Sequence, residues 1–428
     1  MNPARIILGP PGTGKTTTLL GIISSREYGR CLPVSFTKAA AVELRQRIGD
    51  AGLPTEDLLG FGGPSTLHGL CAASLRVGLL DGAGSPAPGV VADPADDAAH
   101  FPIPLPPPTF IPHVKGVTKK AILHRLRCED TQEAATALAT LEEANARDFT
   151  GLLEAFIHAD HDYLPAGPIP DAILVDEAQD LNALQWKVVE RLLVLCSRER
   201  PHGQPPALIL AGDDDQAIMA FQGADALALL QACEANPHAV KVLGNSYRLT
   251  PPVHALATRW SRRIRRRVQK VFMPGRNSRL EAPQEQPPDI ARVFGSTPPR
   301  ALQAAETTQP VNAWLCRTTA QVNTIVSAMH RARPDMLVLG RTGERSWSEG
   351  PPPRFDTPRL TVSTIHQAKG REWDHVMLDM RLPPNSKRTL DRVGSEEADA
   401  EHRVWYVGAT RARWRLTLLL GPHSCYHV

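Results

Sequence analysis

The sequence feature that most constrains the fold is an eight-residue run near the N-terminus, Gly9-Pro10-Pro11-Gly12-Thr13-Gly14-Lys15-Thr16. It fills every fixed position of the pattern G-x-x-x-x-G-K-[ST], in which backbone N–H groups curl around phosphate oxygens. An apolar, strand-like stretch, Ile6-Ile7-Leu8, precedes the run, and Thr17-Thr18-Leu19-Leu20 follows it as the start of a helix. Because the N-terminus of a helix attracts anions, the run predicts a phosphate-binding loop in an α/β fold.

The loop also predicts which ligands the chain takes. Lys15 is expected to reach the terminal phosphates of ATP, and the hydroxyl group of Thr16 to ligate Mg²⁺. The backbone from Gly9 to Thr17 completes the predicted nucleotide site. A chance glycine-rich turn is the alternative, but the flanking strand and helix argue against it. The loop does not identify the work that hydrolysis drives, because unrelated proteins share it.

Composition limits the class of protein. A chain of 428 residues suggests two to three domains, and 42% hydrophobic with 22% charged residues is ordinary for a globular protein. The sequence has no run of eighteen apolar residues and no signal peptide, so we expect a soluble, cytoplasmic protein with no membrane partner. The seven cysteines form no C-x-x-C pair and are predicted to be reduced and mostly buried. A net charge of +3 is too small to indicate nucleic-acid binding by itself.

Strand-like and helical stretches alternate in the first half of the chain. Residues 32–37 are predicted as a strand, 38–48 as a helix, and 172–175 and 207–211 as buried strands. Such alternation is typical of a parallel sheet with helices on both faces. Residues 81–114 are rich in proline and glycine and indicate a loop or an extended linker. The helical pattern from 119 to 161 predicts a small helical insertion within about residues 72–165.

Acidic residues follow both buried strands. Asp176-Glu177-Ala178-Gln179-Asp180 comes after the first, and Gly212-Asp213-Asp214-Asp215-Gln216 comes after the second. In open parallel sheets, ligands bind beyond the carboxyl ends of the strands, so these acids are expected to face the same crevice as the phosphate loop. Asp176 is predicted to hold Mg²⁺, and Glu177 to take the proton from the attacking water. Exposed acids of ordinary turns are the alternative.

A second alternating region follows later in the chain. It runs from residue 311 to the end, with strands predicted near residues 312–316, 360–363, 376–378 and 416–420, and a further strand is predicted before it at 239–243. The two regions give two α/β lobes, residues 1–238 and 239–428. Trp260, Ile264 and Val268 recur at four-residue spacing and predict a helix. Its other faces carry basic side chains, Arg259, Arg262, Arg263, Arg265, Arg266, Arg267 and Lys270. This helix is either a contact for a phosphate backbone or a solvated face. Residues 273–310 are again rich in proline and polar residues.

The ordered set of motifs is more specific than any one of them. With these motifs the chain resembles the UvrD/PcrA/Rep-like group of superfamily 1A DNA helicases. The motifs are the phosphate loop, Ser35-Phe36-Thr37-Lys38-Ala39-Ala40, Thr66-Leu67-His68-Gly69, Asp148-Phe149, the two acidic segments, Asn245-Ser246-Tyr247-Arg248, Thr364-Ile365-His366-Gln367-Ala368-Lys369-Gly370-Arg371-Glu372 and Tyr406-Val407-Gly408-Ala409-Thr410-Arg411-Ala412. The likeness spans almost the whole chain.

The resemblance implies two RecA-like lobes, with ATP in the cleft between them and single-stranded DNA across both. Arg248 and Arg411 would come from the second lobe and meet the γ-phosphate only when the cleft closes. The resemblance assigns Gln216 to positioning the water or sensing the γ-phosphate. It also assigns Tyr247 to stacking on the adenine and Glu372 to binding the ribose.

The same resemblance implies contacts with the DNA strand. The matching positions are Phe36, Thr37, Thr66, His68, Phe221, Thr364 and His366. Hydroxyl and imidazole groups can hydrogen-bond phosphates, and Phe221 can stack on a base without reading its identity. Each of these residues taken alone could equally be structural.

The implied function is that of a compact ATP-dependent translocase and helicase that moves 3′ to 5′ on single-stranded DNA or a 3′-tailed duplex. Residues 341–359 are short where larger relatives insert a whole domain, so we expect the second accessory domain to be missing. Only residues 1–4 precede the first strand, so we also expect weak selectivity for the base of the nucleotide. The alternatives are a nucleic-acid-stimulated ATPase that acts as a switch without unwinding, and an RNA-tracking helicase. A protein that loads the chain onto DNA is left open.

Overall fold

The computed structural model describes most of the chain. It covers residues 2–36, 38–53, 58–75, 109–110, 117–143, 146–158, 164–165, 167–225, 227–274, 290–294, 297–306, 310–333, 336–340, 359–421 and 425–426. The predicted loop or linker at 81–114 and the short segment at 341–359 therefore lie almost entirely outside the described residues. Among the described residues, no helix combines the length and the apolar character needed to cross a lipid bilayer.

The first sheet has six strands in the order β3-β2-β6-β7-β1-β8. Their bounds are β1 Arg5–Leu8, β2 Cys31–Ser35, β3 Ser65–Thr66, β6 Ala172–Asp176, β7 Ala207–Gly212 and β8 Val240–Val242. The pairs β1 with β7, β2 with β6, β2 with β3 and β6 with β7 are all parallel. Every residue of β2 and β6 is buried. Continuous burial is typical of parallel strands covered by helices on both faces.

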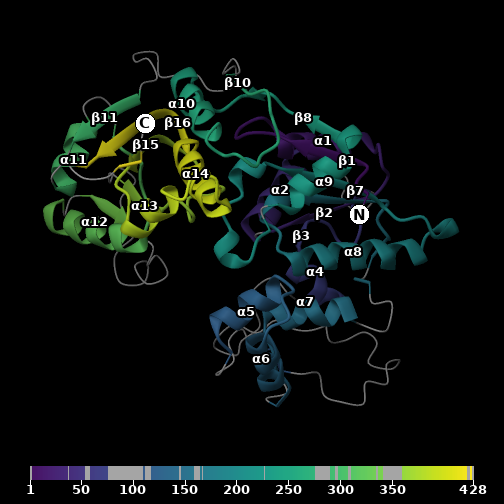
Figure 1. Ribbon diagram of the computed structural model, residues 1–428. Helices are drawn as coiled ribbons and strands as arrows, with labels where there is room; N and C mark the ends of the chain where they lie inside the picture. Colours follow the sequence, from purple (N-terminus) through teal and green to yellow (C-terminus); the bar gives the residue numbers. More distant parts are fainter. Residues whose placement is uncertain are drawn as a thin grey trace. The chain divides into compact units, whose positions relative to one another are not determined.

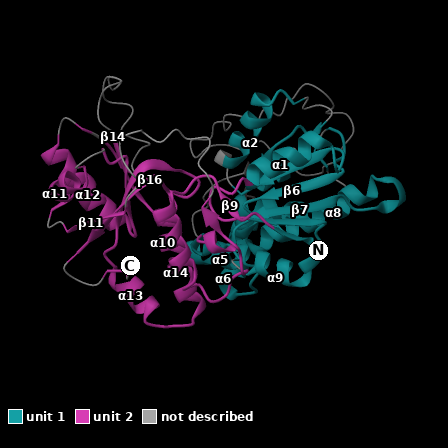
Figure 2. Ribbon diagram, turned by 90° about the horizontal axis from the view of Figure 1, so that it is seen from above, with its two compact units in different colours: residues 1–8, 15–213, 219–241 teal, residues 9–14, 214–218, 242–428 magenta. Residues whose placement is uncertain are grey.

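Helices α1 (Lys15–Ser25) and α2 (Lys38–Asp50) lie on one side of this sheet, and α9 (Ala228–Ala235) lies on the other (Figure 2). Helix α8 (Ala183–Arg198) begins with a capping box, in which Asn182 and Gln185 each accept a hydrogen bond from the other's backbone N–H. Such a box satisfies two donors that the first turn of a helix leaves unpaired.

The predicted helical insertion is present among the described residues. Helices α5 (Lys119–Leu126) and α6 (Gln132–Glu143) pack together beside α4 (Leu67–Ser74) and α7 (Phe149–His158) (Figure 1). Two-residue strands β4 (Thr109–Phe110) and β5 (Ala146–Arg147) pair in parallel nearby. The buried guanidinium of Arg125 joins α5 to α7 within the insertion, because it binds both Asp148, just before α7, and Glu154 in α7.

The second sheet also has six strands, in the order β11-β16-β15-β12-β14-β13. Their bounds are β11 Ile290–Phe294, β12 Ala313–Cys316, β13 Leu337–Leu339, β14 Arg359–Thr364, β15 Trp373–Asp379 and β16 Ala412–Leu420. All five pairings are parallel. Both sheets thus confirm the predicted α/β class, and the strands predicted near 312–316, 360–363, 376–378 and 416–420 are confirmed.

The helices of this second region are α10 (Pro251–Ser261), α11 (Pro298–Ala305), α12 (Thr319–Ala332), α13 (Pro384–Leu390) and α14 (Glu396–Ala409). One side of the core gathers around Trp260 and Trp405, which are fully buried against Tyr426. Aromatic side chains bury about 150–250 Å² each and dominate the energetics of such cores. A short parallel ribbon, β9 (Asn245–Ser246) with β10 (Met273–Pro274), precedes the sheet along the chain.

Two sequence predictions are wrong in detail. The strand expected to open the second lobe is β8, which is an edge strand of the first sheet. The predicted basic helix ends at Ser261, since the N–H groups of Arg265 and Arg266 donate to the carboxylate of Asp399 instead of continuing the helix.

The chain forms two compact units, coloured separately in Figure 2. Unit 1 comprises Met1–Leu8, Lys15–Asp213 and Met219–Lys241, and unit 2 comprises Gly9–Gly14, Asp214–Ile218 and Val242–Val428. The two short segments of unit 2 are the phosphate loop and the turn that follows β7. The cysteines are free thiols, and five of the seven are buried.

Candidate functional site

The phosphate loop turns sharply between β1 and α1. Gly12 and Gly14 have φ angles of +75° and +86°, which side chains other than glycine rarely tolerate. The hydroxyl group of Thr13 donates to the carbonyl oxygen of Pro10 over 2.8 Å and braces the turn. Helix α1 begins directly after the loop with Lys15, which is 9% exposed.

Within unit 2, the loop is held by the end of β9 and the residues that follow it. Ser246 Oγ donates to the carbonyl oxygen of Pro11 over 3.0 Å. The backbone N–H of Tyr247 donates to the carbonyl oxygen of Gly12 over 2.8 Å. A Cβ atom at Gly12 would lie only 2.3 Å from the Cβ of Arg248. The backbone of the loop is therefore in direct contact with two residues of the predicted site, Tyr247 and Arg248.

This contact makes Gly12→Ala a sharp test of the loop. We expect the variant to lose at least about tenfold in nucleotide affinity, because both the positive φ and the clash with Arg248 would have to be relieved. Fluorescence titration with a labelled nucleotide measures the affinity. Gly21→Ala is the matched control, since nothing lies within 4 Å of its added Cβ in α1. The control should bind normally and should raise the free energy of unfolding by about 0.5–1 kcal/mol.

Within unit 1, three predicted residues lie together. Thr16 Oγ donates to a carboxylate oxygen of Asp176 over 3.3 Å, and the backbone N–H of Glu177 donates to the other oxygen over 2.9 Å. Asp176 is 6% exposed, and its burial and the charge of Glu177 raise its pKa to about 6, against the attraction of Lys15.

The donor set of Thr16 and Asp176 suits a hard divalent cation. A hydroxyl and a carboxylate oxygen are the ligand types that Mg²⁺ prefers, and in phosphate-binding sites this ion takes only one or two protein ligands. A buried carboxylate with a raised pKa is also one whose charged form such a cation would favour. Among the described residues there is no group of three or more His, Cys, Asp and Glu side chains that would form a metal site by themselves.

Glu177 is held in an uncommon backbone conformation. Its φ of 54° and ψ of 41° place it in the left-handed region, which for a residue other than glycine costs about 1–3 kcal/mol. Gln179 Nε2 donates to its carboxylate over 2.5 Å, while Gln179 Oε1 accepts from the backbone N–H of Asp213 over 3.0 Å. Gln179 therefore orients the predicted base, a role that sequence reasoning missed although the residue lies in the same acidic segment.

Within unit 2, Gln216 and Arg411 are in contact. Arg411 Nη2 donates to Gln216 Oε1 over 3.0 Å, and both residues are buried, at 2% and 5% exposure. Arg411 Nε also donates to the carbonyl oxygen of Val407. Lys369 Nζ donates to the carbonyl oxygen of Gln216 over 2.7 Å. Lys369 belongs to the motif from Thr364 to Glu372, but the sequence predicts no role for it.

Arg248 and Glu372 form an ion pair in unit 2. Arg248 Nε lies 2.5 Å from one carboxylate oxygen of Glu372, and Arg413 Nη2 lies 2.5 Å from the other. Burial disfavours the charged form of Glu372, but the two guanidinium groups outweigh it and lower its pKa. Tyr247 is 52% exposed and so presents its ring to solvent.

The residues of unit 1 that are predicted to contact the DNA strand differ in how far their side chains are exposed or already occupied. Phe221 is 45% exposed, whereas Thr66 uses its hydroxyl group to accept a hydrogen bond from Gly69 N as the cap of α4. His68 packs edge to face against Phe149, with ring centroids 5.9 Å apart, and burial lowers its pKa to about 4. Phe36 is half-buried, and Thr37 lies outside the described residues.

In unit 2, the residues predicted to contact the DNA strand lie at the end of β14 and just after it. Thr364 is 7% exposed, and its hydroxyl group lies 3.4 Å from Gln367 Oε1. Burial lowers the pKa of His366 to about 4, and the nearby charges of Arg317 and Lys369 act in the same direction. Both predicted histidines are therefore neutral near pH 7.

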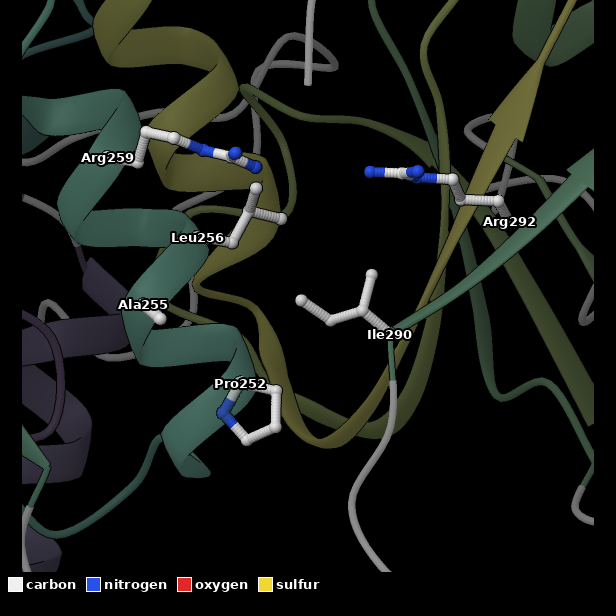
Figure 3. Close-up of a pocket in the computed structure, with 6 residues that line it drawn as sticks. All are labelled: Pro252, Ala255, Leu256, Arg259, Ile290 and Arg292. Atoms are coloured by element: carbon white, nitrogen blue, oxygen red, sulfur yellow. The ribbon is translucent and has the colours of Figure 1, made fainter.

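A hollow of about 640 Å³ lies elsewhere in unit 2, between α10 and β11. Arg259 and Arg292 point toward one another across it, above Leu256 and Ile290, with Pro252 and Ala255 completing the wall (Figure 3). None of the residues predicted to bind the nucleotide lines this hollow, whereas Arg259 belongs to the stretch offered as a possible contact for a phosphate backbone.

A glycine-rich loop between a parallel strand and a helix, with an acidic pair at the end of another strand of the same sheet, defines a nucleoside triphosphate hydrolase of the P-loop class. Two family models refine this assignment. The model described as an AAA domain matches residues 1–222, and the model described as a UvrD-like helicase C-terminal domain matches residues 349–421. The chain belongs to the UvrD-like superfamily 1 helicases, which are ATP hydrolases.

Individual relatives share modest identity with the chain. It is 26% identical to the ATP-dependent DNA helicase UvrD2 of Mycobacterium tuberculosis (strain ATCC 25618 / H37Rv), over 96% of this chain and 76% of the relative. It is 30% identical to the ATP-dependent DNA helicase UvrD1 of Mycobacterium leprae (strain TN), over 52% of this chain and 32% of that protein. A solved arterivirus nonstructural protein 10 (helicase) with DNA aligns with a TM-score of 0.41 at 12% identity, over 97% of this chain and 61% of that one.

Proposed function

We propose that the protein is an ATP-dependent DNA helicase that translocates 3′ to 5′ along single-stranded DNA. The observation that supports the motor chemistry most directly is the buried contact between Gln216 and Arg411, which joins two residues that are 195 positions apart in the sequence. A γ-phosphate sensor and an arginine that share one hydrogen bond can change position together when nucleotide is cleaved. The names of the UvrD1 and UvrD2 relatives support DNA as the substrate.

The proposed chemistry assigns one task to each side chain. Glu177, held by Gln179, accepts the proton of the attacking water. Lys15 neutralises charge on the terminal phosphates, and Arg248 and Arg411 stabilise the charge that develops on the γ-phosphate. Thr16 and Asp176 would hold Mg²⁺, which when bound lowers the negative charge of the β- and γ-phosphates. Arg248 is paired with Glu372, so the proposal requires Arg248 to exchange this carboxylate for the γ-phosphate during hydrolysis.

The nucleotide's base and sugar are proposed to lie against unit 2. Tyr247 is exposed and its backbone N–H binds the carbonyl oxygen of Gly12, which suits stacking of its ring on a base next to the phosphate loop. Release of Glu372 from Arg248 would leave a carboxylate that still pairs with Arg413 and can accept hydrogen bonds from the ribose.

The proposed DNA contacts are mainly sequence-independent. Phe221 can stack on a base for about 1–3 kcal/mol, and His68 and His366 can hydrogen-bond phosphates as neutral groups. Because phosphate contacts dominate such binding, the affinity for single-stranded DNA should fall steeply with added salt.

The pKa values of the two histidines predict how DNA binding depends on pH. His68 and His366 have pKa values of about 4, so neither gains a proton between pH 8 and pH 6, and neither gains a charge that would attract phosphate. The ratio of DNA dissociation constants between His68→Gln and the unaltered protein should therefore be the same at pH 6 and pH 8. Fluorescence anisotropy at constant ionic strength measures it. A ratio that grows at pH 6 would show that His68 becomes charged on the DNA.

A strand-displacement assay tests the proposed function. We expect ATP-dependent separation of a duplex with a 3′ tail, no separation of one with only a 5′ tail, and ATP hydrolysis stimulated by single-stranded DNA. Unwinding from the 5′ tail would contradict the proposed direction. Running the ATPase assay with single-stranded RNA distinguishes the two tracks, since phosphate and stacking contacts do not identify the sugar.

A nucleic-acid-stimulated ATPase that does not unwind is the second candidate, and one observation favours it. The alignment with UvrD2 runs over 545 positions although this chain has 428 residues, so the relative carries additional residues within the aligned region. If those residues are needed to separate strands, the chain would hydrolyse ATP on DNA and act as a switch or need a loading partner. Stimulated hydrolysis without strand displacement would support this candidate.

A further inference from the structure

Unit 2 contains a buried cluster of ion pairs that the proposed chemistry does not use. Asp214 and Asp215 begin the three-residue 3-10 helix η3 (Asp214–Gln216), here named the acidic turn. The side chains of both aspartates are 1% exposed, and the side chain of Lys270 is fully buried. Lys270 Nζ forms an ion pair with Asp214 and lies 3.0 Å from Asp215 Oδ2. One ammonium group thus joins both carboxylates.

A second cation fixes the orientation of the turn. Arg267 Nε lies 2.7 Å from Asp215 Oδ1, and its Nη2 lies 2.5 Å from Oδ2, which is a two-point contact. The backbone N–H of Val268 donates to Asp214 Oδ2 over 2.8 Å. Two-point contacts between arginine and a carboxylate restrict the angle as well as the distance. Residues 262–270, here named the basic arm, therefore bind both aspartates of the acidic turn through Arg267, Val268 and Lys270.

Helix α14 holds the basic arm in turn. The carboxylate of Asp399 accepts the backbone N–H groups of Arg265 and Arg266 over 3.0 and 2.9 Å. Arg403, at 1% exposure, donates from Nη2 to the carbonyl oxygen of Arg266 and from Nε to that of Asp214. The same helix ends at Ala409, two residues before Arg411. The arm, the turn and the arginine are thus connected through one helix.

The acidic turn ends at the predicted sensor. The carbonyl oxygen of Gln216 accepts from Lys369, and its side-chain oxygen accepts from Arg411. The position of this side chain is therefore set by the aspartates on one side and by Arg411 on the other. A buried arrangement of two acids and two bases contributes little to stability compared with apolar residues of the same size, so fixed geometry is the property that it supplies best.

We propose that Lys270 and Arg267 are positioning residues that hold the acidic turn so that the side chain of Gln216 faces Arg411. The proposal rests on the proposed function, because it assigns the two cations a role in ATP hydrolysis through Gln216. Neither cation touches the nucleotide. They set the distance and angle at which Gln216 and Arg411 act together.

The test compares steady-state ATP hydrolysis of Lys270→Met with that of the unaltered protein, in the presence of single-stranded DNA. Loss of the ammonium group should lower kcat by about 10- to 100-fold, since small misplacements of catalytic groups have effects of this size. The KM for ATP should change less than about threefold, because the phosphate loop is intact. Lys270→Met combined with Asp214→Asn removes the unpaired buried charge, so it should recover the melting temperature but not kcat.

A double-mutant cycle with Gln216→Ala separates positioning from a general loss of structure. If Lys270 acts through Gln216, Lys270→Met should cause no further loss of kcat in a Gln216→Ala background. Arg125→Met is the matched control, because it also breaks a buried ion pair, with Asp148 and Glu154 in unit 1. It should lower the melting temperature and leave kcat per folded molecule unchanged.

Three outcomes would overturn the inference. Additive losses in the cycle would show that Lys270 does not act through Gln216. Recovery of kcat in the doubly neutralised variant would show a purely structural role. An unchanged kcat in Gln216→Ala alone would show that Gln216 takes no part in hydrolysis, so its position would not matter. Absence of hydrolysis in the unaltered protein would instead reject the proposed function, so the two failures are distinguishable.

Discussion

Glu177→Gln is expected to lower the turnover number for ATP by about 10²- to 10⁴-fold while nucleotide binding is retained. The amide has nearly the same shape as the carboxylate, so the left-handed backbone at this position should be kept, but it cannot accept a proton from water. The expected result is a stable complex with ATP that binds single-stranded DNA without turnover. Single-turnover hydrolysis, with filter binding for the nucleotide, measures both quantities.

The matched control is Glu190→Gln, an exposed residue of α8 in the same unit. It should hydrolyse ATP at the normal rate. Gln179→Leu adds a graded test, because it removes the donor that orients Glu177 and leaves the carboxylate present. We expect an intermediate loss of kcat. Normal turnover in Glu177→Gln would remove this residue from the role of base.

Arg411→Ala is expected to have the largest effect, a fall in kcat of about 10³- to 10⁵-fold. The guanidinium also donates to Gln216, Val407 and Thr410, so its removal leaves buried acceptors without partners as well as removing the charge. Arg411→Lys keeps the charge but cannot reproduce a planar group with several donors, so it should restore little of the activity. Rates are measured with saturating ATP and single-stranded DNA.

Stability must be checked alongside, because Arg411 is almost fully buried. Arg381→Ala is a suitable control, since it removes an ion pair with buried Asp379 that contacts no predicted site residue among those described. It should keep normal turnover. If Arg411→Lys were fully active, charge alone would suffice and the geometry around Gln216 would be unimportant.

The phosphate loop and the two acidic segments could be predicted from sequence because their chemistry is local. Gly12 and Gly14 must be glycine for conformational reasons, and Asp176 is the last residue of a strand whose five residues are all buried. The sheet that contains them follows from the alternation of apolar strands and helices, and it is confirmed. Periodicity and turn chemistry are properties of neighbouring residues, so they are visible without a structure.

The basic arm could not be predicted correctly for the opposite reason. Arg267 and Lys270 have the same residue types and spacing as a solvated or phosphate-binding face, but their partners Asp214 and Asp215 lie more than fifty residues earlier. The end of α10 at Ser261 likewise depends on Asp399, which is distant in the chain. A charge pattern gives the sign of each residue but not which distant residue pairs with it.

The assignment of Gly9–Gly14 and Asp214–Ile218 to unit 2 has a consequence for how the polypeptide can be divided. A fragment made of residues 242–428 would carry Lys270 and Arg267 without the carboxylates that neutralise them, and Ser246 without the carbonyl group that it binds. In such a fragment, burying the unpaired cations of Arg267 and Lys270 would be strongly unfavourable. If the cations stayed in water instead, the apolar residues packed around them would be exposed. The two halves are therefore poor modules for separate expression or recombination, although most of each unit lies on one side of the boundary between residues 241 and 242.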